Sequence, residues 1–335
     1  AKLARAGLPV PDGFYVTTAA YRDFVAASGL QANILAALET VDAAAPATFE
    51  AASQTIARLF SAAQLPTDIA RPIRDAYINL GSQNAPASGN GRPLSVAVRS
   101  SATAEALPEA SFAGQQETYL NIRGEEAVLV AVQKCWASLW TGRAIAYRLR
   151  QGIPPEQVAL AVVVQKLIPA EAAGILFTAD PVSGRRSEAV INAAWGLGEA
   201  VVGGLVTPDS VTVDRSTGRV ARRETADKSV MTVLTEAGTA EQPVPVSLRN
   251  KAVLSDGQSG ELVRYGAQIE ELYGQPMDIE SALAGGKFAF LQARPITTLG
   301  EAPLEWKPAL PNGIYMRTSV VDLMPDPLSP LFASL

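Results

Sequence analysis

The sequence predicts a mixed α/β fold, of the α+β kind with mixed sheets. Alanine-rich stretches with apolar positions three and four residues apart predict helices, and short apolar runs predict strands. Several strands follow one another closely enough to form hairpins. The order lacks the steady strand–helix alternation of a doubly wound sheet. A chain of 335 residues is long enough to bury more than one core.

The elements are expected in the following order. Residues 18–82 have helical spacing, and residues 83–93 have the composition of a loop. One long helix is expected over 125–150, because Val128, Val132, Trp136, Trp140, Ala144 and Tyr147 fall on one stripe. Another helix is expected over 247–273. Strands are expected at 94–98, 118–122, 158–164, 174–177, 189–193 and 210–213, and a linker with three prolines at 301–313.

Two short strands near the carboxyl-terminal end, joined by a segment with two glycines, are expected to form a hairpin. Strand side chains alternate between faces, so Asp278 and Glu280 should share one face. Phe290, Gln292 and Arg294 should share a face of the neighbouring strand. Carboxylate and amide oxygens can hold Mg²⁺, and a guanidinium can hold phosphate. The hairpin therefore predicts a metal–nucleotide site, although alternating carboxylates are also common on solvated strands.

Two other segments have groups suited to phosphate. Arg99 ends an apolar strand and precedes two serines, so it could clamp a phosphate or simply be solvated. Gly114 lies in a loop of small residues before a strand that starts at Thr118. Such a loop can close over phosphates through its amides, or it can be an ordinary turn.

The end of the strand at 158–164 suits an adenine slot. Gln165, Lys166 and Leu167 would supply apolar walls and backbone groups there, although a strand leaving the core explains them equally well. Glu199 follows Gly-Leu-Gly and could reach a metal or a ribose, or begin a helix. The third glycine position of a dinucleotide-binding motif holds Val201, which argues against a Rossmann domain.

Composition narrows the function classes. The net charge of −5 disfavours general binding to nucleic acid or anionic membranes, and no apolar run approaches the ~18–20 residues that span a bilayer. Cys135 is the single cysteine, which fits a reducing compartment, and we expect a cytoplasmic protein. The chain has no histidine, so it cannot complete phosphohistidine chemistry by itself.

Five stretches form an ordered set of motifs: VAVRSSATAE (96–105), SFAGQQETYLN (111–121), GILFTADP (174–181), WGLGE (195–199) and LQARPIT (291–297). Together they resemble the nucleotide-binding domain shared by phosphoenolpyruvate synthase, pyruvate phosphate dikinase and rifampicin phosphotransferase. The resemblance covers the chain to about residue 299.

The resemblance implies an ATP-grasp domain over residues 1–299, with lobes of roughly 1–160 and 161–299 that hold ATP and Mg²⁺ between them. Residues 300–335 would be a linker and the truncated start of a further domain. Arg99 and Arg294 would contact phosphate and act in catalysis, and Glu280 and Gln292 would bind the metal. The full set of expected cofactor-binding residues is Arg99, Gly114, Thr118, Gln165, Lys166, Leu167, Glu199, Asp278, Glu280, Gln292 and Arg294.

The activity that the resemblance implies is ATP-dependent phosphorylation of a histidine on a separate swivelling domain. That group would then pass to pyruvate or another small molecule on an acceptor-substrate domain. The chain would thus be part of a longer polypeptide. Three alternatives stay open: a rifampicin phosphotransferase-like enzyme, which residues 320–332 resemble more closely, an ATP-grasp ligase, and a nucleotide-binding module without chemistry.

Overall fold

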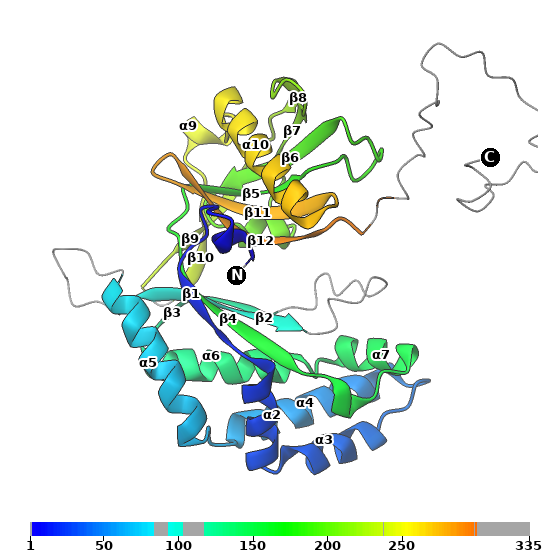
Figure 1. The fold of residues 1–335 in the computed structure, drawn as a ribbon. Helices are drawn as coiled ribbons and strands as arrows, with labels where there is room; N and C mark the ends of the chain where they lie inside the picture. Colours follow the sequence, from blue (N-terminus) through cyan, green and yellow to red (C-terminus); the bar gives the residue numbers. More distant parts are fainter. Residues whose placement is uncertain (1, 84–92, 103–116, 237, 298, 300–335) are drawn as a thin grey trace, which may run out of the picture. The chain divides into compact units, whose positions relative to one another are not determined.

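The computed structural model describes residues 2–83, 93–102, 117–236, 238–297 and 299 (Figure 1). The elements that follow all belong to one compact unit. None of the described helices is long and apolar enough to cross a membrane. Most of the predicted loop at 83–93 and all of the predicted linker at 301–313 fall outside the described residues.

Helices and strands are mixed along the chain, as the sequence predicts. The helices are α1 (Lys2–Arg5), α2 (Thr18–Ala27), α3 (Leu30–Glu39), α4 (Pro46–Ala62), α5 (Thr67–Gln83), α6 (Glu125–Ser138), α7 (Gly142–Gln151), α8 (Glu199–Val202), α9 (Val246–Arg249) and α10 (Asp256–Tyr273). The strands are β1 (Gly13–Val16), β2 (Ser95–Ala102), β3 (Thr118–Arg123), β4 (Leu160–Lys166), β5 (Ala172–Phe177), β6 (Glu188–Trp195), β7 (Asp209–Asp214), β8 (Val220–Glu224), β9 (Val230–Leu234), β10 (Thr239–Pro243), β11 (Met277–Ala284) and β12 (Lys287–Pro295).

The first sheet is antiparallel and has the strand order β1-β4-β2-β3. Helices cover one of its faces (Figure 1), and α2 and α6 pack directly against it. The rings of Phe24, Phe60 and Trp136 pack together in this layer and are almost completely buried. Burial of large aromatic rings contributes much of the energy of such a core. Because β2 alternates, Val96 and Val98 join this core, and the opposite face of the strand carries Arg99.

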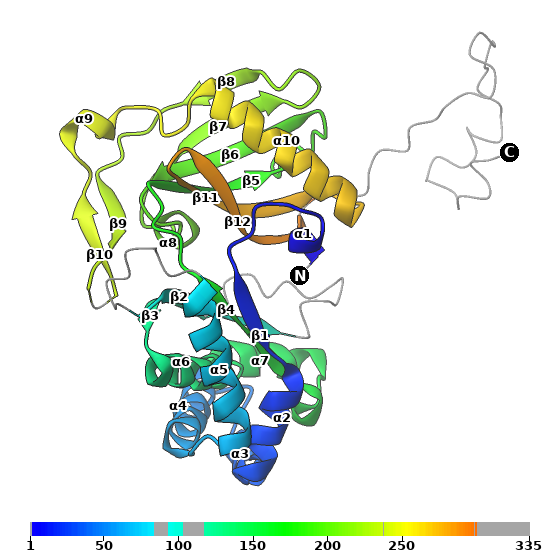
Figure 2. The same cartoon turned by 60° about the vertical axis from the view of Figure 1, so that its left-hand side comes forward.

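The second sheet has the order β12-β11-β5-β6-β7-β8, with every neighbouring pair antiparallel. Helix α10 lies across one face (Figures 1 and 2), and its amino terminus has a capping box formed by Ser255 and Gln258. A Cβ atom at Gly266 would lie 2.5 Å from Leu176 Cδ2, so glycine permits the close approach of helix and sheet. Leu3 of α1 also joins this core, although it lies at the other end of the sequence.

Two predicted long helices are each divided in the structure. The helix expected over 125–150 is interrupted between Leu139 and Thr141, so that α6 and α7 are separate. The Thr141 side chain accepts a hydrogen bond from the Ala144 N–H at 3.3 Å and thereby caps α7. The segment expected as one helix over 247–273 is likewise divided into two helices, α9 and α10, because Ser255 caps the start of a new helix.

The predicted hairpin is confirmed, with longer strands and a shorter turn than expected. Gly285 and Gly286 alone connect β11 to β12, with φ values of +55° and +72° that favour glycine. A bulge at Leu291 shifts the register, so that Phe290 lies opposite Ser281 and packs in the core. The expectation that Phe290 shares a face with Gln292 is therefore wrong, because the bulge inserts one residue between two pairs.

Candidate functional site

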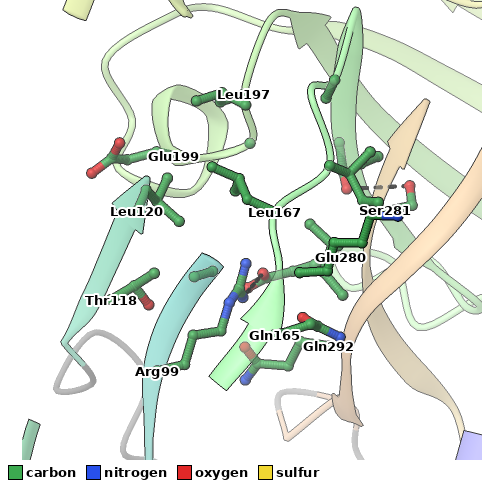
Figure 3. A pocket seen from close by; sticks show the side chains of 18 of the residues that line it. Arg99, Thr118, Leu120, Gln165, Leu167, Leu197, Glu199, Glu280, Ser281 and Gln292 are labelled. Atoms are coloured by element: carbon green, nitrogen blue, oxygen red, sulfur yellow. Dashed lines mark hydrogen bonds and ion pairs between the residues drawn. The ribbon is translucent and has the colours of Figure 1, made fainter. Parts of the chain in front are cut away.

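A cleft of about 490 Å³ is lined by residues of both large sheets and by the start of α8 (Figure 3). Its volume lies within the ~300–1,000 Å³ typical of small-molecule sites. Nine residues that the sequence analysis selected line it: Arg99, Thr118, Gln165, Lys166, Leu167, Glu199, Glu280, Gln292 and Arg294. The structure thus brings these residues together, while their roles stay predictions. Gly114, which was predicted to lie in a loop over the phosphates, falls outside the described residues.

Arg99 and Glu280 form an ion pair across the cleft. Arg99 Nη1 lies 3.1 Å from Glu280 Oε2, although the two residues are 181 positions apart in the sequence. Their side chains are 15% and 14% exposed. The buried Nε of Arg99 has no hydrogen-bond partner among the described residues. The guanidinium therefore has a donor that is not used within the described protein.

Arg294 and Asp278 form a second ion pair beside the first. Arg294 Nε donates to Asp278 Oδ2 at 2.9 Å, and the buried Oδ1 has no partner among the described residues. The pKa of Asp278 is raised, mainly by burial and to a smaller extent by the Glu280 carboxylate, although Arg294 acts in the opposite direction. Asp278 does not line the cleft, so the structure gives no direct support to its predicted contact with a cofactor.

Glu280 and Gln292 are the residues best placed to hold a metal. They lie directly opposite each other on β11 and β12, so their side chains share a face. Both line the cleft, and both offer the hard oxygen atoms that Mg²⁺ prefers. Within the described residues, no group of three or more acidic, histidine or cysteine side chains forms a ready-made cation site.

The end of β4 contributes Gln165, Lys166 and Leu167 to the cleft. The N–H of Lys166 donates to Asp12 O at 2.8 Å, and the N–H of Leu167 donates to Ser95 O at 3.0 Å. These two amides are therefore already used within the protein. They are not available to a base, whereas the Leu167 side chain can still supply an apolar wall.

Thr118 and Glu199 lie on the side of the cleft opposite Glu280 and Gln292 in the view of Figure 3. Thr118 starts β3, and Glu199 starts α8 directly after Gly198. The Glu199 carboxylate accepts a long hydrogen bond of 3.4 Å from Thr239 Oγ1. Glu199 therefore begins a helix and also lines the cleft, while its contact with a metal or a ribose stays a prediction.

Several lining residues were not selected from the sequence. Leu120 shares the face of Thr118 by strand alternation, and Leu197 lies inside the Gly-Leu-Gly-Glu motif, so both could have been found. Leu291 reaches the cleft only because of the bulge, which no local pattern indicates. Together with Ile168, these side chains make part of the cleft apolar while the ion pairs make another part charged. An apolar section beside charged groups suits the base and the phosphates of a nucleotide.

Comparisons with known proteins agree with this chemistry. A family model described as the pyruvate phosphate dikinase, AMP/ATP-binding domain matches residues 1–309. A probable phosphoenolpyruvate synthase of Methanocaldococcus jannaschii is 48% identical over 303 residues, which cover 90% of this chain and 25% of that protein. A probable phosphoenolpyruvate synthase of Methanothermobacter thermautotrophicus is 45% identical, over 91% of this chain and 44% of that protein. A rifampicin phosphotransferase of Streptomyces sviceus is 43% identical, over 98% of this chain and 36% of that protein. The chain thus spans less than half the length of each of these relatives.

Proposed function

Because this chain belongs to the family of pyruvate phosphate dikinase AMP/ATP-binding domains, we propose that its cleft binds Mg-ATP for phosphoryl transfer to a histidine on a separate domain. The mixed α/β architecture is that of an ATP-grasp-like domain, as the sequence predicted. A small molecule such as pyruvate would then receive the phosphoryl group. The swivelling domain that carries the histidine, the acceptor-substrate domain and the cytoplasmic location all stay predictions.

One observation carries the proposal. Arg99 and Arg294 line the same cleft as Glu280 and Gln292, so cationic groups and oxygen ligands converge within a volume of nucleotide size. ATP needs both kinds of group, because its triphosphate is anionic and is normally bound with Mg²⁺.

The residues present fit a magnesium ion. Mg²⁺ is usually bound by one or two carboxylates together with phosphate oxygens, and Glu280 with Gln292 provides such a small donor set. The unused donor on Arg99 would be available to a phosphate oxygen of the same ligand. When bound, the ion would neutralise charge on the phosphates.

The side chains of the cleft would bind and orient the nucleotide and would stabilise the charge that shifts during transfer. Arg99 and Arg294 would neutralise the negative charge that shifts toward the leaving group during transfer. Leu167 and Leu197 would hold the base between apolar walls, and Glu199 would reach the ribose. No histidine is present in the chain, so the acceptor must come from elsewhere.

A rifampicin phosphotransferase-like activity is the second candidate. The match to the Streptomyces sviceus enzyme extends over 332 residues and 98% of the chain, whereas the more similar synthases match 90–91%. The longer match includes the carboxyl-terminal segment. The family match favours either phosphotransferase over an ATP-grasp ligase.

Titration calorimetry with Mg-ATP tests the proposal, with Mg²⁺ alone and GTP as comparisons. We expect saturable one-site binding of Mg-ATP. Transfer is tested by mixing the chain with the separately produced histidine-bearing domain of a relative and ATP labelled in turn at each phosphate. An acid-labile label on that domain is expected. Failure to bind Mg-ATP would favour a module without nucleotide chemistry.

A further inference from the structure

Asn121 of β3 has an unusual backbone for a buried residue. Its φ is +57°, and it is the only residue other than glycine with a positive φ in the described part of the chain. Asparagine tolerates this left-handed conformation better than most residues, but the conformation still has an energetic cost. The residue is only 5% exposed. A strained, buried polar residue is retained where its surroundings hold it in place.

The Asn121 amide uses all of its hydrogen-bonding groups. Oδ1 accepts from Ser95 Oγ at 2.6 Å and from Arg123 Nε at 3.0 Å, and both donors belong to the first sheet. Nδ2 donates to Thr235 O at 2.6 Å and to Gly238 O at 2.7 Å. These two carbonyls lie at the turn between β9 and β10, so one side chain joins the first sheet to this hairpin.

The β9–β10 hairpin also contacts a wall of the cleft. Leu197 N donates to Thr232 O of β9 at 2.8 Å. A Cβ atom at Gly196 would lie 2.3 Å from the same oxygen, so glycine is needed for this approach. On β10, Thr239 Oγ1 donates to the Glu199 carboxylate. The residues that line the cleft next to Gly196 are thus attached to the hairpin at both of its strands.

We propose that Asn121 is a positioning residue for nucleotide binding, which acts through the β9–β10 hairpin on Leu197 and Glu199. Figures 1 and 2 show the turn of the hairpin at the end of β3. Thr118 and Leu120 of β3 line the cleft on one side of this connection, and Leu197 and Glu199 line it on the other. The amide therefore fixes the spacing of two cleft walls that belong to different sheets. The inference rests on the proposed function.

The test compares Asn121→Asp and Asn121→Gly with the unaltered chain. Aspartate keeps the shape but replaces two donors with an anionic oxygen that faces two carbonyls. Glycine keeps the positive φ without strain but removes the amide. Asn33→Asp on the exposed surface of α3 is the matched control, because it makes the same chemical change far from the cleft. Thr239→Val removes only the link to Glu199 and should have a smaller effect.

Two measurements decide the inference. Stopped-flow dissociation of a fluorescent N-methylanthraniloyl ATP, with Mg²⁺, should be roughly tenfold faster in both Asn121 variants and unchanged in Asn33→Asp. Hydrogen exchange without nucleotide should be faster in residues 230–243 and unchanged in α2 and α6. A variant that lost its whole fold would instead exchange rapidly in those helices, and the milder Ser95→Ala, which removes one donor to Asn121 Oδ1, would then carry the kinetic test.

The outcomes distinguish failure of the proposed function from failure of this inference alone. If the unaltered chain does not bind the probe, the proposed function fails, and this inference fails with it. If the chain binds the probe and the folded Asn121 variants release it at the original rate, the inference alone is overturned. Faster release together with faster exchange in the hairpin supports it.

Discussion

The ion pair of Lys228 with Asp209 and the ion pair of Arg99 with Glu280 differ in how completely their polar atoms are satisfied. Lys228 and Asp209 are 0% and 1% exposed, and Lys228 Nζ also donates to Ala226 O. The Asp209 carboxylate further accepts from the N–H groups of Ala226 and Val253. The Arg99 side chain lines a cleft and has a buried nitrogen without a partner among the described residues.

The difference distinguishes a structural pair from a candidate binding pair. A buried charge that is fully paired and hydrogen-bonded holds neighbouring segments together and has nothing left to offer a ligand. In a partly satisfied pair that lines a cleft, each side chain can exchange its partner for a phosphate or a metal. Removal of Asp209 should therefore affect folding, whereas removal of Glu280 should affect binding.

The largest effect is expected for Asp209→Ala. The change leaves the buried Lys228 ammonium without its counter-charge and two backbone N–H groups without partners, so the free energy of unfolding should fall by ~3–5 kcal/mol. Urea denaturation followed by circular dichroism measures this loss. Asp227→Ala is the control, because Asp227 pairs with Arg249 at the surface and its loss should cost only ~0.2–1 kcal/mol. Equal losses for both variants would contradict the distinction.

A smaller effect is expected for Glu280→Ala and Arg294→Ala. Each should weaken Mg-ATP binding by ~1–3 kcal/mol, the scale of a hydrogen bond to a charged group or of leaving its partner unpaired. Each should lower the urea midpoint less than Asp209→Ala does, because the side chains of these two pairs are partly exposed. Calorimetry at a fixed Mg²⁺ concentration checks the affinity. Unchanged affinity for both variants would argue against the site, whatever the stability measurements give.

The smallest effect concerns pH. The pKa of Asp278 is raised in the folded chain, mainly by burial, so the folded state binds this proton more tightly than the unfolded state does. The contribution to stability is fully present below the ordinary pKa near 4 and is lost as pH rises through the raised folded value. The unaltered chain should therefore gain stability relative to Asp278→Asn as pH falls from 7 toward 4. Urea midpoints of both proteins across this range measure the difference, and an opposite trend would show that Arg294 outweighs burial and the Glu280 carboxylate together.

Much of the candidate site could be predicted because it depends on short-range regularities. Alternation puts Asp278 and Glu280 on one face of β11, and Gln292 and Arg294 on one face of β12, as expected, whereas the bulge at Leu291 sets these two pairs opposite each other. The apolar alternation of β2 likewise indicates that Arg99 faces away from the helical core. These patterns act over a few residues, and backbone geometry is enough to read them.

Other features could not be predicted, because they depend on contacts between distant segments. The division between α6 and α7 follows from a threonine cap inside an otherwise helical stripe, and propensity did not indicate it. The strands β9 and β10 are partly exposed and carry weak patterns, so the hairpin that Asn121 holds was not expected at all. The bulge at Leu291 is likewise visible only in the paired strands.

The sequence by itself determined the composition of the site: two arginines, a carboxylate and an amide at strand spacing, and no histidine to accept a phosphoryl group. Only the tertiary structure decided which of these groups meet. Arg99 reaches Glu280 across 181 positions, and Asn121 reaches Gly238 across 117, because packing of separate sheets brings them together. Periodicity sets the direction of a side chain relative to its own strand, whereas the partner that it finds depends on the whole fold.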